Sequence, residues 1–478
     1  MTSSAGAFRR TLSSPSRAKS SATREVSQFT TTRWNYIKDG HSAEKVIKKL
    51  LDKAERAGDQ RDPVGATPLC LAVLYSKSTN NKPPDDRKTN AHRSLGWEEK
   101  EEHEAIAKKI WDHPEMKHLR TLAYDRTDYE GETAIHLAIA KRRGDLVCYF
   151  LDHASSDERK ILLEERRAVG TFNVAHFKTS DGEKRCRFGE HPVCWAACSN
   201  QEKLVDRLVT YGASLECKTH FGDSILHMLV RWSGWLEDTD REKAAFVEDG
   251  SRGASNAEWL INMFDSIERK MLDRLVKDLK LREPVPLEKQ QHLIRTKIYT
   301  RNNDNLTPLL LAASGKNATG KNATTGPRRE MFDHLLKKHV QSMWIFGPFR
   351  GITMDVGEID PVVVVARAQK AARQRQNETG AQAQGERESA MKNPTVLSIL
   401  VQEQNTDLIC NKYIQALLDT KWDKYIKEVR REGRVGPLSL SLSLFLFLSI
   451  SISPTHTYSY KRITGHRSSS TASSKRSS

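Results

Sequence analysis

The chain has 478 residues, of which 37% are hydrophobic, and its 77 Lys and Arg outnumber its 61 Asp and Glu, for a net charge of +16. This length accommodates about two or three domains with a real core. The charge predicts attraction to an anionic membrane surface, but no zinc-finger spacing or aromatic-rich RNA motif accompanies it, so we expect no specific nucleic-acid partner. The seven Cys are scattered and odd in number, which predicts free thiols in a reducing compartment and no metal site.

The N-terminal segment, residues 1–34, is rich in Ser, Thr and Arg and has no acidic residue before Glu25. It lacks the apolar run of a secretory signal. Its few apolar residues predict a disordered cytosolic tail. A mitochondrial transit peptide is the alternative, because such peptides are also rich in Arg and Ser.

A repeated pattern follows in the next part of the chain. A glycine recurs, followed two residues later by Thr, Ser or His and then by an apolar run. Two of the intervals between these glycines are 33 residues (222 − 189) and 66 residues (131 − 65). The segments are "GATPLCLAV" at Gly65, "GETAIHLAI" at Gly131, "GEHPVCWAA" at Gly189, "GDSILHMLV" at Gly222 and a variant, "NLTPLLLAA", at Asn305. They resemble ankyrin repeats, which implies stacked helix pairs. We expect about six repeats between residues 35 and 340.

Local chemistry agrees with helices that begin at these segments. Thr67 and Thr307 are suited to cap the first helix of a pair, and the prolines that follow them fit the first helical position. The second helix carries an apolar pattern at i, i+1, i+4 and i+5, too narrow to fold alone. Polar insertions at 75–97 and 154–187 predict long finger loops, and 256–280 predicts a long amphipathic helix.

Longer segments resemble the cytoplasmic domain of vanilloid-type transient receptor potential (TRPV) channels. The resemblance rests on "YEGETAIHLAIAKRRGDLV" from Tyr129, "FGEHPVCWAACSNQEKLV" from Phe188 and "TRNNDNLTPLLLAA" from Thr300. "MWIFGPFRGITMDVGEID" from Met343 is similar to the linker hairpin of that family, and "ICNKYIQALLDTKWDKYIKEV" from Ile409 is similar to its pre-membrane helix. The match covers residues 35 to 429 in order.

This resemblance implies a mostly α architecture in five parts. After the tail at 1–34 come an ankyrin-repeat domain (35–340), a linker (341–408) with a β-hairpin at 343–360 and a polar insertion at 366–393, a pre-transmembrane coupling helix (409–429) and a low-complexity tail (430–478).

The resemblance also implies functional residues. Phe172, Phe177 and Phe188 of the finger region would contact the hairpin of a neighbouring subunit, at Trp344, Gly347 and Pro348. The coupling helix would act through Lys421, Trp422 and Tyr425. Alternatively, Phe188, Trp344 and Trp422 are ordinary core or linker aromatics. Ala66 and Leu71 stand where some family members have ATP-binding lysines, so no cofactor is expected.

The stretch "GPLSLSLSLFLFLSISISP" from Gly436 to Pro454 does not fit the family. Between its prolines lie 16 residues, six of them serine, so a helix would reach only about 24 Å, short of a hydrocarbon core of about 30 Å. We expect the chain to depart from its family just after Lys427, through translated intronic or frameshifted sequence or a divergent end. A marginal membrane-associated segment is the alternative.

These features predict the cytoplasmic part of a TRPV-like, calcium-permeable cation channel subunit, lacking its own pore. Its expected partners are other subunits, in a tetramer, and cytosolic proteins. The family implies a position beneath the plasma membrane, whereas this chain alone is expected in the cytosol. The alternative is a soluble ankyrin scaffold independent of any channel. An enzyme is not expected, because His136 and His227 occupy the position of the histidine that steadies a turn in these repeats.

Overall fold

The computed structural model describes residues 37–39, 41–51, 61, 65–76, 102–125, 129–170, 173–178, 184–186, 188–235, 256–281, 284–314, 327–346, 349–360 and 393–431. The predicted N-terminal tail, the polar insertion except its last residue and the serine–leucine stretch at 436–454 lie outside these residues. The described residues are mostly helical and belong to two compact units. The first unit contains the residues up to 173 together with 190–195 and 206–213, and the second contains the others.

The first unit is built from short helices. They are α2 (Ala43–Leu51), α3 (Pro68–Tyr75), α5 (Glu102–Asp112), the 3₁₀ helix η2 (Pro114–Thr121), α6 (Ala134–Ala140), α7 (Gly144–Asp152), α8 (Ser156–Lys160) and the π-helical turn η3 (Ile161–Glu165). Two further helices, α9 (Pro192–Cys198) and α10 (Glu202–Thr210), contribute residues to both units.

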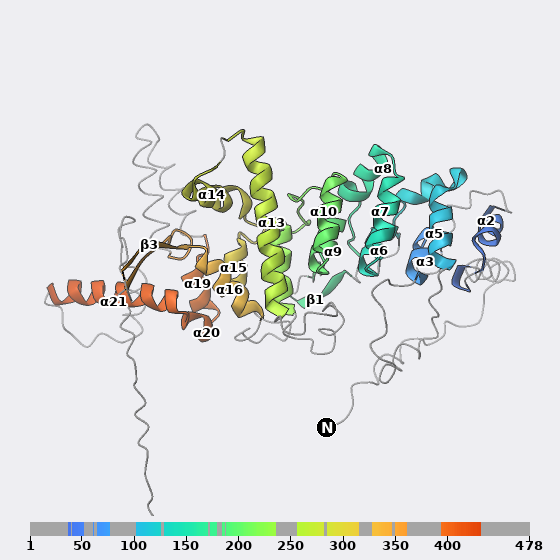
Figure 1. Ribbon diagram of the computed structural model, residues 1–478. Helices are drawn as coiled ribbons and strands as arrows, with labels where there is room; N and C mark the ends of the chain where they lie inside the picture. Colours follow the sequence, from blue (N-terminus) through green and yellow to red (C-terminus); the bar gives the residue numbers. More distant parts are fainter. Residues whose placement is uncertain are drawn as a thin grey trace, which may run out of the picture. The chain divides into compact units, whose positions relative to one another are not determined.

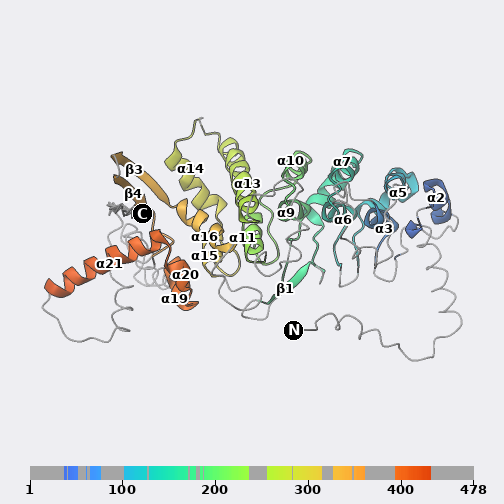
Figure 2. The ribbon, with the colours of Figure 1, turned by 60° about the horizontal axis from the view of Figure 1, so that its bottom comes forward.

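The helices of the first unit pack two by two. α3 contacts both α5 and α6, while α7 contacts both α5 and α6. In both ribbon views, α3 and α6 therefore form one row and α5 and α7 the other (Figure 1, Figure 2). Within the row of α5 and α7, the fully buried rings of Trp111 and Phe150 stack with their centroids 4.3 Å apart.

The predicted helix starts are confirmed at two positions. The Thr67 hydroxyl accepts a hydrogen bond from the Cys70 amide at 3.1 Å, with proline directly after the cap. Thr307 accepts from the Leu310 amide at 3.3 Å, again followed by proline. The cap satisfies a free N–H of the first turn, and the proline stands where it removes none that is needed.

The second unit contains most of the remaining helices. They are α11 (Ile225–Trp235), α13 (Asn256–Asp278), α14 (Leu287–Leu293), the π-helical turn η4 (Ile294–Ile298), α15 (Pro308–Ala313), α16 (Pro327–Lys337), α19 (Val396–Gln402), α20 (Thr406–Ile409) and α21 (Lys412–Arg431). The long helix α13 confirms the amphipathic helix predicted at 256–280. α11, α13, α15 and α16 pack two by two as well, around the buried rings of Phe264 and Phe332.

Two antiparallel hairpins complete the described strands. β1 (Val174–Lys178) pairs with β2 (Lys184–Cys186) in the predicted finger region. β3 (Val340–Phe346) pairs with β4 (Phe349–Met354) where the linker hairpin is predicted, beginning three residues earlier than expected. Its register shifts between Ser342 and Trp344, so a bulge interrupts the ladder there.

No helix in the described part of the chain combines the length and the apolarity that a membrane crossing requires.

Candidate functional site

The structure places the predicted interface residues in different environments. Phe188 is buried, and its ring lies 5.2 Å from that of Trp232 on α11. Phe177 and Trp344 belong to β1 and β3, where only their backbone is described, and Phe172, Gly347 and Pro348 lie outside the described residues. Phe188 is therefore buried in the core, as expected if it is an ordinary core aromatic residue. A role at a subunit interface stays a prediction.

Helix α21 covers most of the predicted coupling helix (409–429) and begins three residues later than predicted, at Lys412. Asn411 separates α20 from α21, since its side-chain oxygen accepts from the Tyr413 amide at 2.9 Å and so caps the second helix. Lys421 is fully buried and forms an ion pair with Asp360, Nζ to Oδ2, at 2.8 Å. The neighbouring Trp422 is 44% exposed. For Tyr425 only the helical backbone is described. The predicted Lys-Trp-x-x-Tyr pattern therefore contains one buried side chain, Lys421, and one exposed side chain, Trp422.

The linker hairpin is attached to the helices by polar contacts at its base. The Arg295 guanidinium donates to Asp355 Oδ2 at 2.5 Å, and the Asp355 amide donates to the His339 carbonyl at 2.9 Å. The Thr307 hydroxyl donates to the Glu358 carboxylate. Burial raises the pKa of Glu358, although Thr307 and Arg301 oppose this effect. The hairpin base is therefore fixed to η4 and to the N-terminus of α15.

A charged network that sequence analysis did not identify joins α13 to α16. Lys338 donates to Asp265 and Glu268, each at 2.7 Å, and His334 Nε2 lies 2.9 Å from Asp265 Oδ1. The Tyr299 hydroxyl donates to Glu268. Burial and the Glu268 carboxylate raise the pKa of Tyr299 well above its ordinary value, so this phenol is neutral. The sequence contained a signal for this network. Asp265 and Glu268 are spaced i, i+3, and His334 and Lys338 are spaced i, i+4, so the members of each pair lie on the same side of a helix.

Two buried histidines connect successive segments within each unit. His136 Nδ1 accepts from the Thr133 amide at 3.2 Å, so its proton lies on Nε2, which donates to the Glu190 carbonyl at 3.3 Å. His227 Nδ1 accepts from the Ser224 amide at 3.2 Å, and its Nε2 donates to the Leu306 carbonyl at 2.9 Å. The predicted structural role of both histidines is therefore confirmed: each ring joins its own helix start to the next repeated segment.

The neutral histidines make stability depend on pH. Burial lowers the pKa of His136 to about 3 and that of His339 to about 4, and it also lowers the pKa of His227. An unfolded histidine titrates at about 6.5. Because the folded pKa values are depressed, this stability is complete above pH 6.5 and is lost as the pH falls towards the folded values. Each such histidine makes the free energy of unfolding fall by about 1.4 kcal/mol per pH unit in that window.

We expect urea unfolding to show this loss between pH 6.5 and pH 5. His136→Asn is expected to reduce the loss by roughly 2 kcal/mol relative to the wild type over the same interval. His118→Asn, at an exposed position, is the control and should keep the wild-type slope. An unchanged slope in His136→Asn would show that this ring is not held neutral.

The residue after the repeated glycine is acidic in three segments. Asp223 forms an ion pair with Arg231 at 2.9 Å, and Glu190 forms a longer one with Arg167 at 3.7 Å. Both carboxylate oxygens of Glu132 are buried without a hydrogen-bond partner, and burial raises the pKa of this group to about 8. The effect on stability has the opposite sign to that of the histidines: the folded state holds the proton more tightly, so stability falls as the pH rises from about 4.5 to 8.

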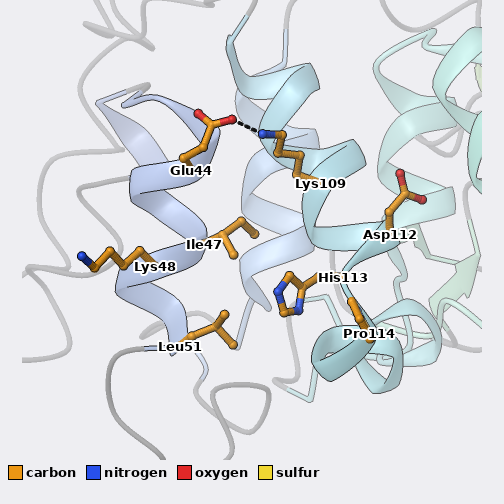
Figure 3. A pocket seen from close by; sticks show the side chains of 8 residues that line it. All are labelled: Glu44, Ile47, Lys48, Leu51, Lys109, Asp112, His113 and Pro114. Carbon is orange, nitrogen blue, oxygen red and sulfur yellow. Dashed lines mark hydrogen bonds and ion pairs between the residues drawn. The ribbon is translucent and has the colours of Figure 1, made fainter.

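A surface groove of about 630 Å³ lies between α2 and α5 of the first unit (Figure 3). Ile47 and Leu51 of α2 line it together with His113 and Pro114, and the Glu44–Lys109 ion pair bridges the two helices at its rim. The lining is apolar in the middle and charged at the edge, which suits contact with another polypeptide better than chemistry.

Within the described residues, no group of three or more His, Cys, Asp or Glu side chains is arranged to hold a metal ion. Cys194 and Cys198, which share one face of α9, are both buried, as expected for small core residues. Burial raises the pKa of the Cys198 thiol well above its ordinary value.

Comparison with known proteins identifies relatives, although no protein-family model matches the chain. The chain is 24% identical over 326 residues to transient receptor potential cation channel subfamily V member 1 of Canis lupus familiaris, which covers 66% of the chain and 30% of that channel. It is 27% identical over 195 residues to subfamily V member 5 of Mus musculus, covering 39% of the chain and 20% of that channel. Subfamily V member 6 of Homo sapiens is 25% identical over 174 residues, 36% of the chain and 16% of that channel.

These relatives are cation channels of one subfamily, which confirms the predicted resemblance. The aligned region spans less than a third of the length of each of them.

Proposed function

From the similarity to subfamily V channels, we propose that residues 35–429 form the cytoplasmic ankyrin-repeat and linker region of a TRPV-like cation channel subunit. The observation that carries the proposal is the match to three members of that subfamily, the longest over 66% of the chain. The chain would lie at the cytoplasmic face of the plasma membrane and mediate subunit assembly and protein interaction. No catalytic role is proposed.

Helix packing supports an ankyrin-type array. In the first unit, α3–α5 and α6–α7 pack two by two, and in the second unit α11–α13 and α15–α16 do the same. The buried histidines at equivalent places, His136 and His227, join successive segments. Within each unit, one of these pairs packs on the other, as a stacked array requires. We propose about six such repeats between residues 35 and 340.

The linker supports a connection towards a pore. A hairpin of β3 and β4 is followed by α19, α20 and the 20-residue helix α21. This order corresponds to the hairpin and pre-membrane helix that the family resemblance implies. We propose that the hairpin at Trp344–Pro348 contacts the finger region of a neighbouring subunit, and that α21 transmits movement of the array.

Co-assembly with a full-length subfamily V channel tests the proposal. We expect the chain to be captured with that channel from detergent-solubilised membranes. Trp344→Ala is expected to reduce capture about tenfold or more, because aromatic anchors dominate interface energies. Leu287→Ala is the matched control, since Leu287 is 66% exposed on α14 and outside the proposed contact. Absence of capture by the wild-type chain would contradict the proposal.

A soluble scaffold is the second candidate function. The groove between α2 and α5 favours it, because an apolar floor with a charged rim is suited to a polypeptide. A chain that binds cytosolic proteins but not the channel in the same experiment would support this alternative.

A further inference from the structure

Helix α21 buries a lysine within its apolar stripe. Ile414 and Leu417 are almost completely buried, and Lys421, four residues after Leu417, is 0% exposed. These side chains share one face of the helix, so the lysine occupies a position where an apolar residue would be expected. An ammonium group at such a position requires a partner with the opposite charge.

The partner, Asp360, belongs to a segment that is fixed on both sides. Its amide donates to the Val356 carbonyl at 3.0 Å, which closes the turn after β4. The preceding carbonyls of Glu358 and Ile359 accept from the amides of Val396 and Leu397 at the start of α19, each at 3.1 Å. Asp360 is also 0% exposed. Its carboxylate therefore stands at a rigid junction between the hairpin and α19, 61 residues before Lys421 (421 − 360).

A second polar contact lies just before the beginning of α21. Asn411 Nδ2 donates to Asp333 Oδ1 of α16 at 2.6 Å. Trp422, the residue after the lysine, is 44% exposed, so a smaller part of its side chain is packed against the protein than for Ile414 or Leu417. The Asn411 contact and the buried pair, ten residues later (421 − 411), thus hold α21 at two points along its length.

We infer that the Lys421–Asp360 ion pair positions α21 on the linker. Lys421 is the positioning residue of the Lys-Trp-x-x-Tyr pattern. Removal of either charge takes the ion-pair partner away from the other buried group, which is far less favourable than removal of both. Loss of one partner therefore releases the second half of α21. This inference concerns the segment that the proposed function uses, but it does not depend on assembly with a channel.

Hydrogen–deuterium exchange of the purified full chain, followed by mass spectrometry, tests the inference. In Lys421→Met, amides of peptides from 412–431 are expected to exchange about tenfold faster or more, while peptides from α13 keep the wild-type rate. Asp360→Asn keeps the shape of the side chain and should give the same local increase if Lys421→Met does not fold. In the double variant Asp360→Leu with Lys421→Met, rates should return to within about threefold of the wild type.

Lys412→Met is the control, because it removes an exposed lysine from the same helix; its peptides should exchange as in the wild type. Equal acceleration in α13 and α21 would mean that the pair stabilises the whole unit, and would overturn the positioning role. Unchanged exchange in both single variants would overturn it too. Because only this chain is measured, failure of co-assembly with a channel would leave these outcomes unaffected.

Discussion

Gly131→Ala is expected to lower the free energy of unfolding by about 3–5 kcal/mol. Gly131 has φ of +81°, and a Cβ added there would lie 1.7 Å from the Arg167 carbonyl oxygen. The segment after Arg167 cannot shift easily, because the amides of Val169 and Gly170 both donate to the Glu130 carbonyl, at 2.8 and 3.0 Å. Urea unfolding of the two proteins measures the difference.

Gly212→Ala is the matched control for this substitution. Gly212 also has a positive φ, +108°, but no atom lies within 4 Å of an added Cβ. Only the backbone penalty should remain, about 1–2 kcal/mol. Equal losses in the two variants would show that contact with Arg167 is not what requires glycine at position 131.

Asp223→Ala is expected to cost about 3–5 kcal/mol of unfolding free energy. Asp223 is 2% exposed and accepts two hydrogen bonds from Arg231, at 2.9 and 3.2 Å, and one from Asn302 at 2.8 Å. Burial raises the pKa of Asp223, but Arg231 and Asn302 more than compensate, so the pKa is lower than usual. Removal of the carboxylate takes these hydrogen bonds from both donors, and Arg231 is left beside the more exposed Asp304, 3.8 Å away.

Two further variants separate this pair from an ordinary surface contact. The double variant Asp223→Ala with Arg231→Met should be less destabilised than Asp223→Ala alone, because the guanidinium is removed together with its buried partner. Asp278→Ala breaks the Arg274–Asp278 pair, whose side chains are 53% and 64% exposed, and should cost less than about 0.5 kcal/mol. A single Asp223 variant as stable as Asp278→Ala would contradict the assigned role of the buried pair.

The candidate site was only partly predictable from sequence. The pattern at Lys421, Trp422 and Tyr425 directed attention to the correct helix, but it gave no indication that Lys421 is buried and Trp422 exposed. A lysine within a charged sequence is normally expected at the surface. Its partner is 61 residues away in the chain, beyond any helical spacing. Phe188 is a second example, because burial beside Trp232 depends on α11.

Local sequence determined where many of the helices begin. The cap at Thr67, the proline after it and the spacing of apolar residues act over a few positions, so they can be recognised without the fold. The same holds for the amphipathic stretch that forms α13 and for the role of His136 and His227 at their own helix starts.

Only the tertiary structure decided which charges are buried in pairs. The fully buried pair of Asp360 with Lys421 joins elements that are distant in the chain, and so does the half-buried network of Asp265, Glu268 and Lys338. The physical reason is that a buried charge is stable only beside a partner of opposite charge. Spacing along one helix can show that two like charges share a face, but it does not show which other element supplies the partner.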